Sequence, residues 1–128
     1  MKEVTAAIIV RDGRVLITQR APGENLAGKW EFPGGKIEAG ETPEECLKRE
    51  IKEELNVDIE VLSFFGQSSY EYDSGTIRLK AFYCRWIAGD FSLRVHSRLE
   101  WVTGRELERY DFAAADIPFA QKLSSLEK

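Results

Sequence analysis

The chain has 128 residues, of which 43% are hydrophobic and 31% are charged, and its formal net charge is −4 at pH 7. That length suits one compact domain with a core of its own and leaves no room for a second, so we expect residues 1–128 to form a single domain. The negative charge argues against a nucleic-acid-binding surface, although it is compatible with small polyphosphates that arrive as magnesium complexes.

The cysteine and histidine content excludes two common kinds of stabilisation. Cys46, Cys84 and the single histidine, His96, form neither a disulfide framework nor a zinc-binding spacing. A β-rich pattern begins at Val4 without a charged-then-apolar leader, and no apolar run is long enough to span a membrane. We therefore expect a cytoplasmic protein, monomeric or homodimeric, with reduced thiols and no membrane or nucleic-acid partner.

The first third of the chain predicts a hairpin followed by a long loop. Residues 4–10 and 15–19 are rich in β-forming side chains, and the Asp-Gly pair at 12–13 is typical of a hairpin turn. Residues 20–29 contain a proline and two glycines and should form a loop. The sequence Phe-Pro-Gly-Gly at 32–35 follows neither a strand nor a helix pattern, and its glycines allow the backbone to approach a ligand closely.

A helix is predicted after this loop from local signals alone. Thr42 and Glu45 form a capping box around Pro43, which suits the first helical position. Asn56 tolerates the left-handed conformation in which helices often end. The helix should therefore begin at Thr42 and end near Asn56. Its buried stripe consists of Leu47, Ile51 and Leu55.

The second half reads as strands followed by short helices. Four strands are expected, at residues 57–65, 76–86, 91–95 and 99–102. Residues 76–86 alternate, placing Ile77, Leu79, Ala81 and Tyr83 on one face. Thr103 and Glu106 repeat the capping-box pattern of a short helix, and residues 118–126 should form the last one.

Three acidic side chains crowd the end of the first helix. Glu50, Glu53 and Glu54 share an arc beside the apolar stripe, and mutual repulsion there would raise their pKa values unless positive charge compensates. Arg49 can hold one carboxylate, and hard cations such as Mg²⁺ or Mn²⁺ suit the others. The alternative is an ordinary solvated acidic face, which the adjoining glycine segment disfavours.

Residues 35–57 resemble the signature of the Nudix hydrolases: Gly, five residues, Glu, seven residues, Arg-Glu, an aliphatic, any residue, Glu-Glu, any residue, Gly, an aliphatic. The matching positions are Gly35, Glu41, Arg49, Glu50, Ile51, Glu53, Glu54 and Val57. Asn56 stands in place of the final glycine, which is a mild change where φ is positive. Residues 19–21, 30–36 and 113–118 also look like MutT-type members, and the last segment looks most like the CTP pyrophosphohydrolase branch.

The resemblance implies an α+β fold, an α/β/α sandwich around a mixed sheet. It also implies Mg²⁺-dependent hydrolysis of a nucleoside triphosphate, of the oxidised purine or the cytidine or 5-methylcytidine type, to a nucleoside monophosphate and pyrophosphate. Two alternatives stay open. The substrate could be another nucleoside diphosphate derivative such as a dinucleoside polyphosphate, or the chain could be a sensor that binds a nucleotide without cleaving it. Sensors commonly lose the signature glutamates, which this chain keeps.

Carried over by position, the resemblance assigns the catalytic machinery. Glu53, Glu54 and the carbonyl of Gly34 would bind the metal, and Glu50 would be a further ligand or the general base. Which carboxylate acts as the base stays open. Arg49 would orient the glutamates. Glu41 and Lys36 would support the water or the phosphates.

Several side chains are candidates for nucleotide binding. Phe32, Tyr72 and Tyr83 could stack on the base, with core packing as the alternative for each. Asp116 could accept a hydrogen bond from an exocyclic amine of cytosine or guanine, or could cap the last helix. Arg20 could contact phosphate or form a surface ion pair.

One element that the resemblance implies is missing. Related enzymes often supply another metal-binding Glu from the loop before the late strand, and that position holds Val95 here. His96 is the only obvious substitute, although a lone loop histidine is more often solvated.

Overall fold

The structure, a computed structural model, describes residues 1–126. Its strands are β1 (Lys2–Arg11), β2 (Arg14–Arg20), β3 (Trp30–Glu31), β4 (Asp58–Tyr72), β5 (Gly75–Ala88) and β6 (His96–Val102). Its helices are α1 (Pro43–Leu55), the short 3₁₀ helices η1 (Arg105–Arg109) and η2 (Ala114–Asp116), and α2 (Ile117–Leu126). Among the described residues, no helix has the length and apolar character needed to cross a membrane.

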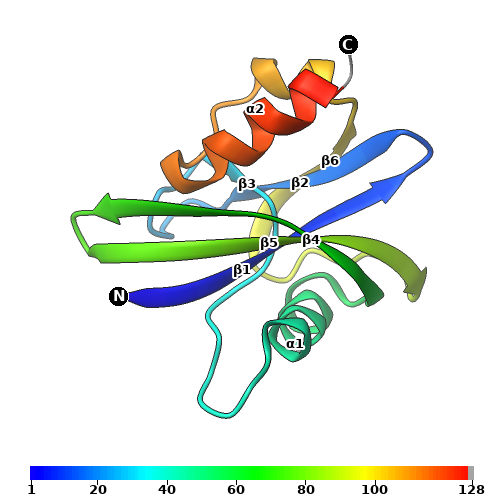
Figure 1. The fold of residues 1–128 in the computed structure, drawn as a ribbon. Coiled ribbons are helices and arrows are strands. Elements are labelled where there is room, and N and C mark those ends of the chain that lie inside the picture. Colours follow the sequence, from blue (N-terminus) through cyan, green and yellow to red (C-terminus); the bar gives the residue numbers. More distant parts are fainter. Residues whose placement is uncertain (127–128) are drawn as a thin grey trace.

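A mixed sheet of six strands separates the two long helices (Figure 1). The strands lie in the order β3-β2-β1-β5-β4, and β6 pairs with β2. β1 and β5 run parallel, with Val4 opposite Leu79, and the other pairs are antiparallel. α1 covers one side of this sheet and α2 covers the other (Figure 1). The predicted α/β/α sandwich is confirmed.

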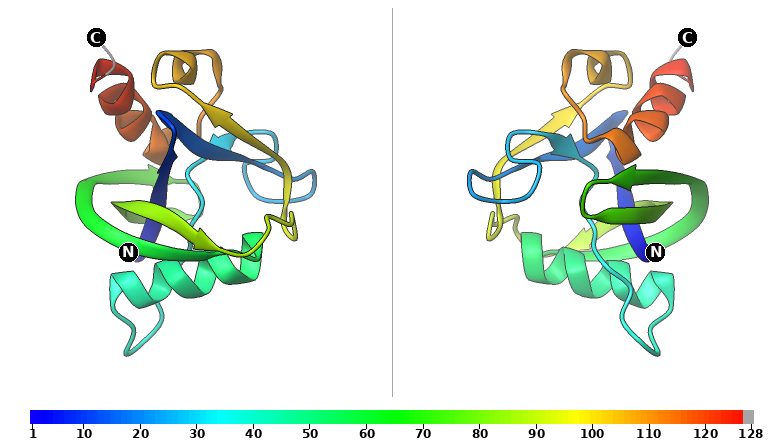
Figure 2. Two further views of the ribbon diagram at one scale, coloured as in Figure 1. Left: turned by 90° about the vertical axis from the view of Figure 1, so that its right-hand side faces the viewer. Right: turned by 90° about the vertical axis from the view of Figure 1, so that its left-hand side faces the viewer.

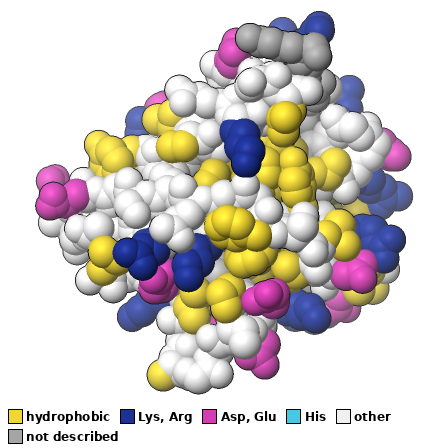
Figure 3. Space-filling model, viewed as in Figure 1, with side chains coloured by type: hydrophobic (Ala, Val, Ile, Leu, Met, Phe, Trp, Pro, Cys, Tyr) yellow, Lys and Arg dark blue, Asp and Glu magenta, His cyan; other side chains and the backbone are white. Residues whose placement is uncertain are grey.

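The alternation of side chains along β1 explains why both faces of the sheet are covered. Ala6 and Ile8 belong to the core cluster on the α2 side, whereas Ala7 and Ile9 belong to the cluster on the α1 side, and all four are fully buried. A strand whose successive residues are all buried needs a packed layer on each face. On the surface shown in Figure 3, hydrophobic side chains are exposed between α2 and α1, and Lys and Arg side chains lie beside them.

Helix α1 has the boundaries that its local sequence predicts. Thr42 is the N-cap, and its side chain and that of Glu45 exchange hydrogen bonds with each other's backbone N–H groups, at 3.1 and 2.8 Å. Asn56 ends the helix in the left-handed conformation with φ of 64°. The capping box, Pro43 at the first turn and the terminal Asn are therefore confirmed.

The predicted strand at residues 91–95 is wrong. No strand forms there, and β6 begins at His96. Instead, the backbone N–H groups of Ser92 and Arg94 donate to the carbonyls of Leu55 and Glu54, at 3.0 and 3.2 Å. The segment thus satisfies carbonyls at the end of α1 that the helix itself leaves unpaired.

The remaining differences concern element lengths and one short strand. β4 extends to Tyr72, seven residues beyond the predicted end, because it pairs with β5 throughout the hairpin. The pair Trp30–Glu31 forms β3, which the sequence did not predict. Thr103 and Glu106 form reciprocal hydrogen bonds before η1, as their spacing indicates. The last helix begins one residue earlier than predicted, at Ile117.

Candidate active site

The acidic residues of α1 lie at three different depths because the apolar stripe fixes how the helix rotates. Leu47, Ile51 and Leu55 are fully buried against the sheet. The side chain of Glu50 is 16% exposed and that of Glu53 is 60% exposed. Glu54 lines a cavity of about 210 Å³ next to β3 and β6.

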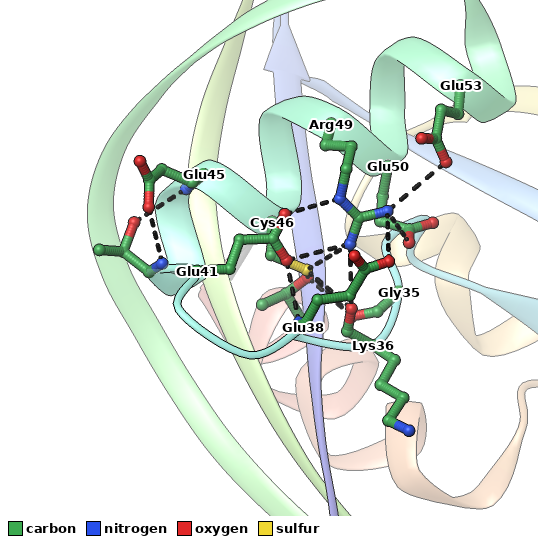
Figure 4. Close-up of polar contacts among 11 residues, drawn as sticks. Gly35, Lys36, Glu38, Glu41, Glu45, Cys46, Arg49, Glu50 and Glu53 are labelled. Atoms are coloured by element: carbon green, nitrogen blue, oxygen red, sulfur yellow. Dashed lines mark hydrogen bonds and ion pairs between the residues drawn. The ribbon is translucent and has the colours of Figure 1, made fainter.

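Arg49 joins Glu41, Glu50 and Glu53 into one network (Figure 4). Its Nε and Nη2 donate to the two carboxylate oxygens of Glu41 at 2.6 and 3.0 Å, and Nη1 donates to Glu50 Oε1 at 2.7 Å. Nη1 also lies 3.5 Å from Glu53 Oε2. Hydrogen bonds from Arg49 lower the pKa of Glu41 to about 2, and the same bonds raise the pKa of Arg49. The guanidinium therefore fixes Glu41 and Glu50 in one geometry.

The glycine segment, residues 32–35, runs alongside β1 and pairs with it through backbone hydrogen bonds. In Figure 2 the chain continues from this segment into the loop before α1. The Gly35 carbonyl accepts hydrogen bonds from Thr5 N–H at 2.8 Å and from Thr5 Oγ1 at 3.1 Å. A Cβ at Gly34 would overlap the carbonyl oxygen of Thr5, and a Cβ at Gly35 would overlap the Glu50 carboxylate. Both glycines are thus required by close approach.

Glu54 is the acidic residue whose surroundings fit a cation. Its Oε1 is buried without a hydrogen-bond partner among the described residues. Burial and the negative charges of Glu31 and Glu50 raise the pKa of Glu54 to about 9. No group of three or more His, Cys, Asp or Glu side chains in the described chain converges as a ready metal site. An unpaired buried oxygen among other carboxylates is nevertheless an environment that a divalent cation would relieve.

A second cavity, of about 90 Å³, lies between the glycine segment and η2. Arg20, Phe32, Tyr72 and Asp116, four of the side chains expected to bind nucleotide, line this base cavity. A larger hollow of about 430 Å³ between η1 and α2 contains none of the expected site residues. Of the residues predicted for metal binding, Glu54 and Gly34 line the cavity of about 210 Å³, and this cavity and the base cavity share Arg20, Glu31 and Gly34 in their walls.

Asp116 has a buried carboxyl that is tied to the base cavity. Its Oδ1 accepts a hydrogen bond from Phe32 N–H at 3.0 Å. Burial, and then the negative charge of Glu31, raise its pKa well above the usual value. Among the described residues, the Asp116 carboxyl bonds to Phe32 N–H and does not cap α2.

Two expected residues lie elsewhere. Tyr83 does not reach the base cavity: it packs edge-to-face on Phe65, with ring centroids 4.9 Å apart, and lines a separate hollow near the β1–β2 turn. It shares a sheet face with Ile77, which does line the cavity, but six residues along a strand amount to roughly 20 Å. The side chain of Lys36 points away from Arg49 (Figure 4), and only its carbonyl contacts that residue, at 3.1 Å.

Sequence reasoning missed Glu31 and misjudged His96. The His96 side chain is only 4% exposed, so the expectation of a solvated histidine is wrong. Its Nε2 lies 2.9 Å from Glu31 Oε2, and Glu31 Oε1 accepts from Arg20 Nε at 3.0 Å. An alternating pattern of apolar and polar residues cannot be recognised in β3, because this strand has only two residues, so the sequence gives no sign of the contact. Val95, where related enzymes have Glu, is 43% exposed and lines the cavity of about 210 Å³.

Comparison with known proteins decides the family, since the NUDIX domain model matches residues 1–123. The chain belongs to the NUDIX family. It is 36% identical to the CTP pyrophosphohydrolase of Escherichia coli over 98% of this chain and 93% of that protein. It is also 35% identical to the 8-oxo-dGTP diphosphatase of the same organism, over 98% of this chain and all of the relative.

Among solved structures, the solution structure of the Escherichia coli ORF135 protein superposes with a TM-score of 0.85 at 35% identity. The match covers 99% of this chain and 91% of that one. Relatives that extend over nearly the whole chain are therefore Nudix hydrolases, and the predicted enzyme class and MutT-like membership are confirmed.

Proposed function

We propose that this Nudix hydrolase cleaves nucleoside triphosphates, of the oxidised purine or the cytidine or 5-methylcytidine type, to a nucleoside monophosphate and pyrophosphate. The proposal includes dependence on Mg²⁺, action as a single domain of residues 1–128, and a cytoplasmic location. The observation that carries it is the unpaired, buried oxygen of Glu54, which lies in a cavity that adjoins the base cavity. The activities of the two Escherichia coli relatives support the choice of substrate class.

The metal-binding residues in this proposal come from the Arg49 network and from the cavity that Gly34 and Glu54 line. Glu50, Glu53, Glu54 and the carbonyl of Gly34 would hold the cation. When bound, it would neutralise phosphate charge and acidify a water molecule. Arg49 keeps Glu50 oriented through a 2.7 Å hydrogen bond and is itself held by both oxygens of Glu41. Glu41 would act through Arg49, and Lys36, whose side chain points away from this network, would contact the phosphates from outside it.

The substrate-binding residues divide between the two cavities. Phe32 and Tyr72 would provide walls for the base, and Arg20, between the cavities, would contact phosphate. Asp116 would read the base. Burial raises the pKa of its carboxyl well above the usual value and so favours the protonated form, which offers a donor as well as an acceptor. Such a group can bind a carbonyl or ring nitrogen of the base, in addition to the exocyclic amine expected from the sequence.

The test is a panel of nucleotides assayed for released pyrophosphate in the presence of Mg²⁺. The panel should contain natural and oxidised nucleoside triphosphates, 5-methyl-dCTP and a dinucleoside polyphosphate. We expect the highest kcat/KM with an oxidised purine or a cytidine triphosphate. Preference for the dinucleoside polyphosphate would replace the proposed substrate. Binding of nucleotides without cleavage of any would instead support a sensor.

A further inference from the structure

A chain of hydrogen bonds connects three strands behind the proposed phosphate-binding residue. The β2–β6 register places Arg20 opposite His96, and β3 lies along the other edge of β2. Glu31, on β3, uses one carboxylate oxygen for Arg20 and the other for His96, at 3.0 and 2.9 Å. Backbone pairing thus brings together three side chains that are far apart in the sequence.

Burial increases along this chain of contacts. The Arg20 side chain is 34% exposed, Glu31 is 13% exposed and His96 is 4% exposed. A carboxylate only accepts hydrogen bonds, so ionised Glu31 pairs with the His96 tautomer that carries the proton on Nε2. A hydrogen bond from a nearly buried imidazole holds Glu31 in one rotamer, and Glu31 in turn holds Arg20.

Arg20 is placed where such restraint matters. It lines both the base cavity and the cavity that contains Glu54. Its Nε is bound to Glu31, and its Nη1 donates to the Asn25 carbonyl at 3.3 Å. Arginine has five N–H donors in a planar fork, so these two contacts set the plane of the guanidinium and leave other donors for an incoming oxygen.

We propose that His96 is a positioning residue, which acts through Glu31 to fix the guanidinium of Arg20 for contact with the phosphate chain of the substrate. This inference rests on the proposed function, which assigns Arg20 to phosphate. Without His96, Glu31 keeps a single partner and is free to turn. Arg20 then samples several orientations, and the cost of ordering it is added to substrate binding.

The first test compares His96→Leu with His96→Gln. We expect His96→Leu to raise KM about tenfold while kcat changes by less than about threefold. A hydrogen bond to a charged group contributes enough free energy to account for the tenfold change in KM. His96→Gln keeps a side-chain N–H donor and should restore most of the affinity. Ser97→Ala, at the next position of β6, controls for disturbance of the strand. A KM unchanged in His96→Leu would overturn the inference.

A double-mutant cycle with Arg20→Ala shows through which residue His96 acts. If His96 works only by fixing Arg20, then His96→Leu should not raise KM further when Arg20 is already absent. A full, additive effect in the Arg20→Ala background would overturn the inference. Pulsed EPR of bound Mn²⁺ gives a further test. Coupling of Mn²⁺ to an imidazole nitrogen in the wild type, absent in His96→Leu, would show that His96 is a metal ligand and would overturn the inference.

The inference can fail separately from the proposed function. If the wild-type protein hydrolyses nucleoside triphosphates and His96→Leu does so with unchanged KM, only the role of His96 is refuted. If the wild type hydrolyses none, the proposed function is refuted. Calorimetric binding of inorganic tripolyphosphate with Mg²⁺ then still tests His96, since affinity should fall about tenfold in His96→Leu and recover in His96→Gln.

Discussion

Replacing Glu54 with Gln is expected to stabilise the metal-free protein at neutral pH while abolishing hydrolysis. Burial, with the negative charges of Glu31 and Glu50, raises the pKa of Glu54 from 4.5 to about 9. The folded state therefore retains a proton that the unfolded chain has already lost. For an acid with a raised pKa, stability is greatest below pH 4.5 and declines as pH rises towards 9.

The size of this effect follows from the two pKa values. Each pH unit between them costs the folded state about 1.4 kcal/mol. Since pH 7 lies about 2.5 units above the ordinary value of 4.5, the metal-free wild type should lose about 3 kcal/mol there, relative to pH 4.5. Glutamine has nearly the same volume and no titrating proton, so Glu54→Gln avoids this loss.

The assay is denaturant unfolding in the presence of a chelator at pH 5 and pH 8. The stability advantage of Glu54→Gln over the wild type should grow by about 4 kcal/mol between these pH values. Glu53→Gln is the matched control, because the Glu53 side chain is 60% exposed, and its difference from the wild type should vary little with pH. The reasoning would be refuted if the stability difference between Glu54→Gln and the wild type did not change with pH. It would also be refuted if the stability difference of Glu53→Gln changed by the same amount.

Three further substitutions test the rest of the site. Gly35→Ala should lower kcat by about a hundredfold, because the added Cβ displaces the Glu50 carboxylate; steady-state kinetics would show this, with Gly66→Ala, which meets only ordinary contacts, as the control. Arg49→Lys should lower kcat by a similar factor of about a hundred, because an ammonium cannot make the paired hydrogen bonds to Glu41; an unchanged kcat would exclude the orienting role. Asp116→Asn should change the ratio of kcat/KM values between bases at least about tenfold, whereas Tyr83→Phe should leave it unchanged; equal shifts in both would place Tyr83 at the base after all.

Features that depend on a few neighbouring residues could be predicted from the sequence. The cap at Thr42, the left-handed Asn56 and the buried stripe of α1 follow from local geometry, and the structure confirms them. The cluster of Arg49 with the glutamates follows from helix periodicity once the stripe is known. The placement of the base cavity was accessible only through the family resemblance.

Features that depend on pairing between distant segments could not be predicted. Residues 91–95 have strand-forming side chains, but carbonyls at the end of α1 provide better partners for their N–H groups. The contact of His96 with Glu31 requires the register of β6 on β2, which periodicity does not specify. The sequence likewise identifies the face of β5 that Tyr83 shares with Ile77, but not that Ile77 lines the base cavity and Tyr83 packs on Phe65.

The most direct test of the central claim is phosphorus NMR of the reaction with the best substrate of the panel. With Mg²⁺ present, we predict resonances of a nucleoside monophosphate and pyrophosphate in equal amounts, and neither product when Glu54→Gln replaces the wild type. A nucleoside diphosphate with inorganic phosphate, or turnover by Glu54→Gln at the wild-type rate, would contradict the account.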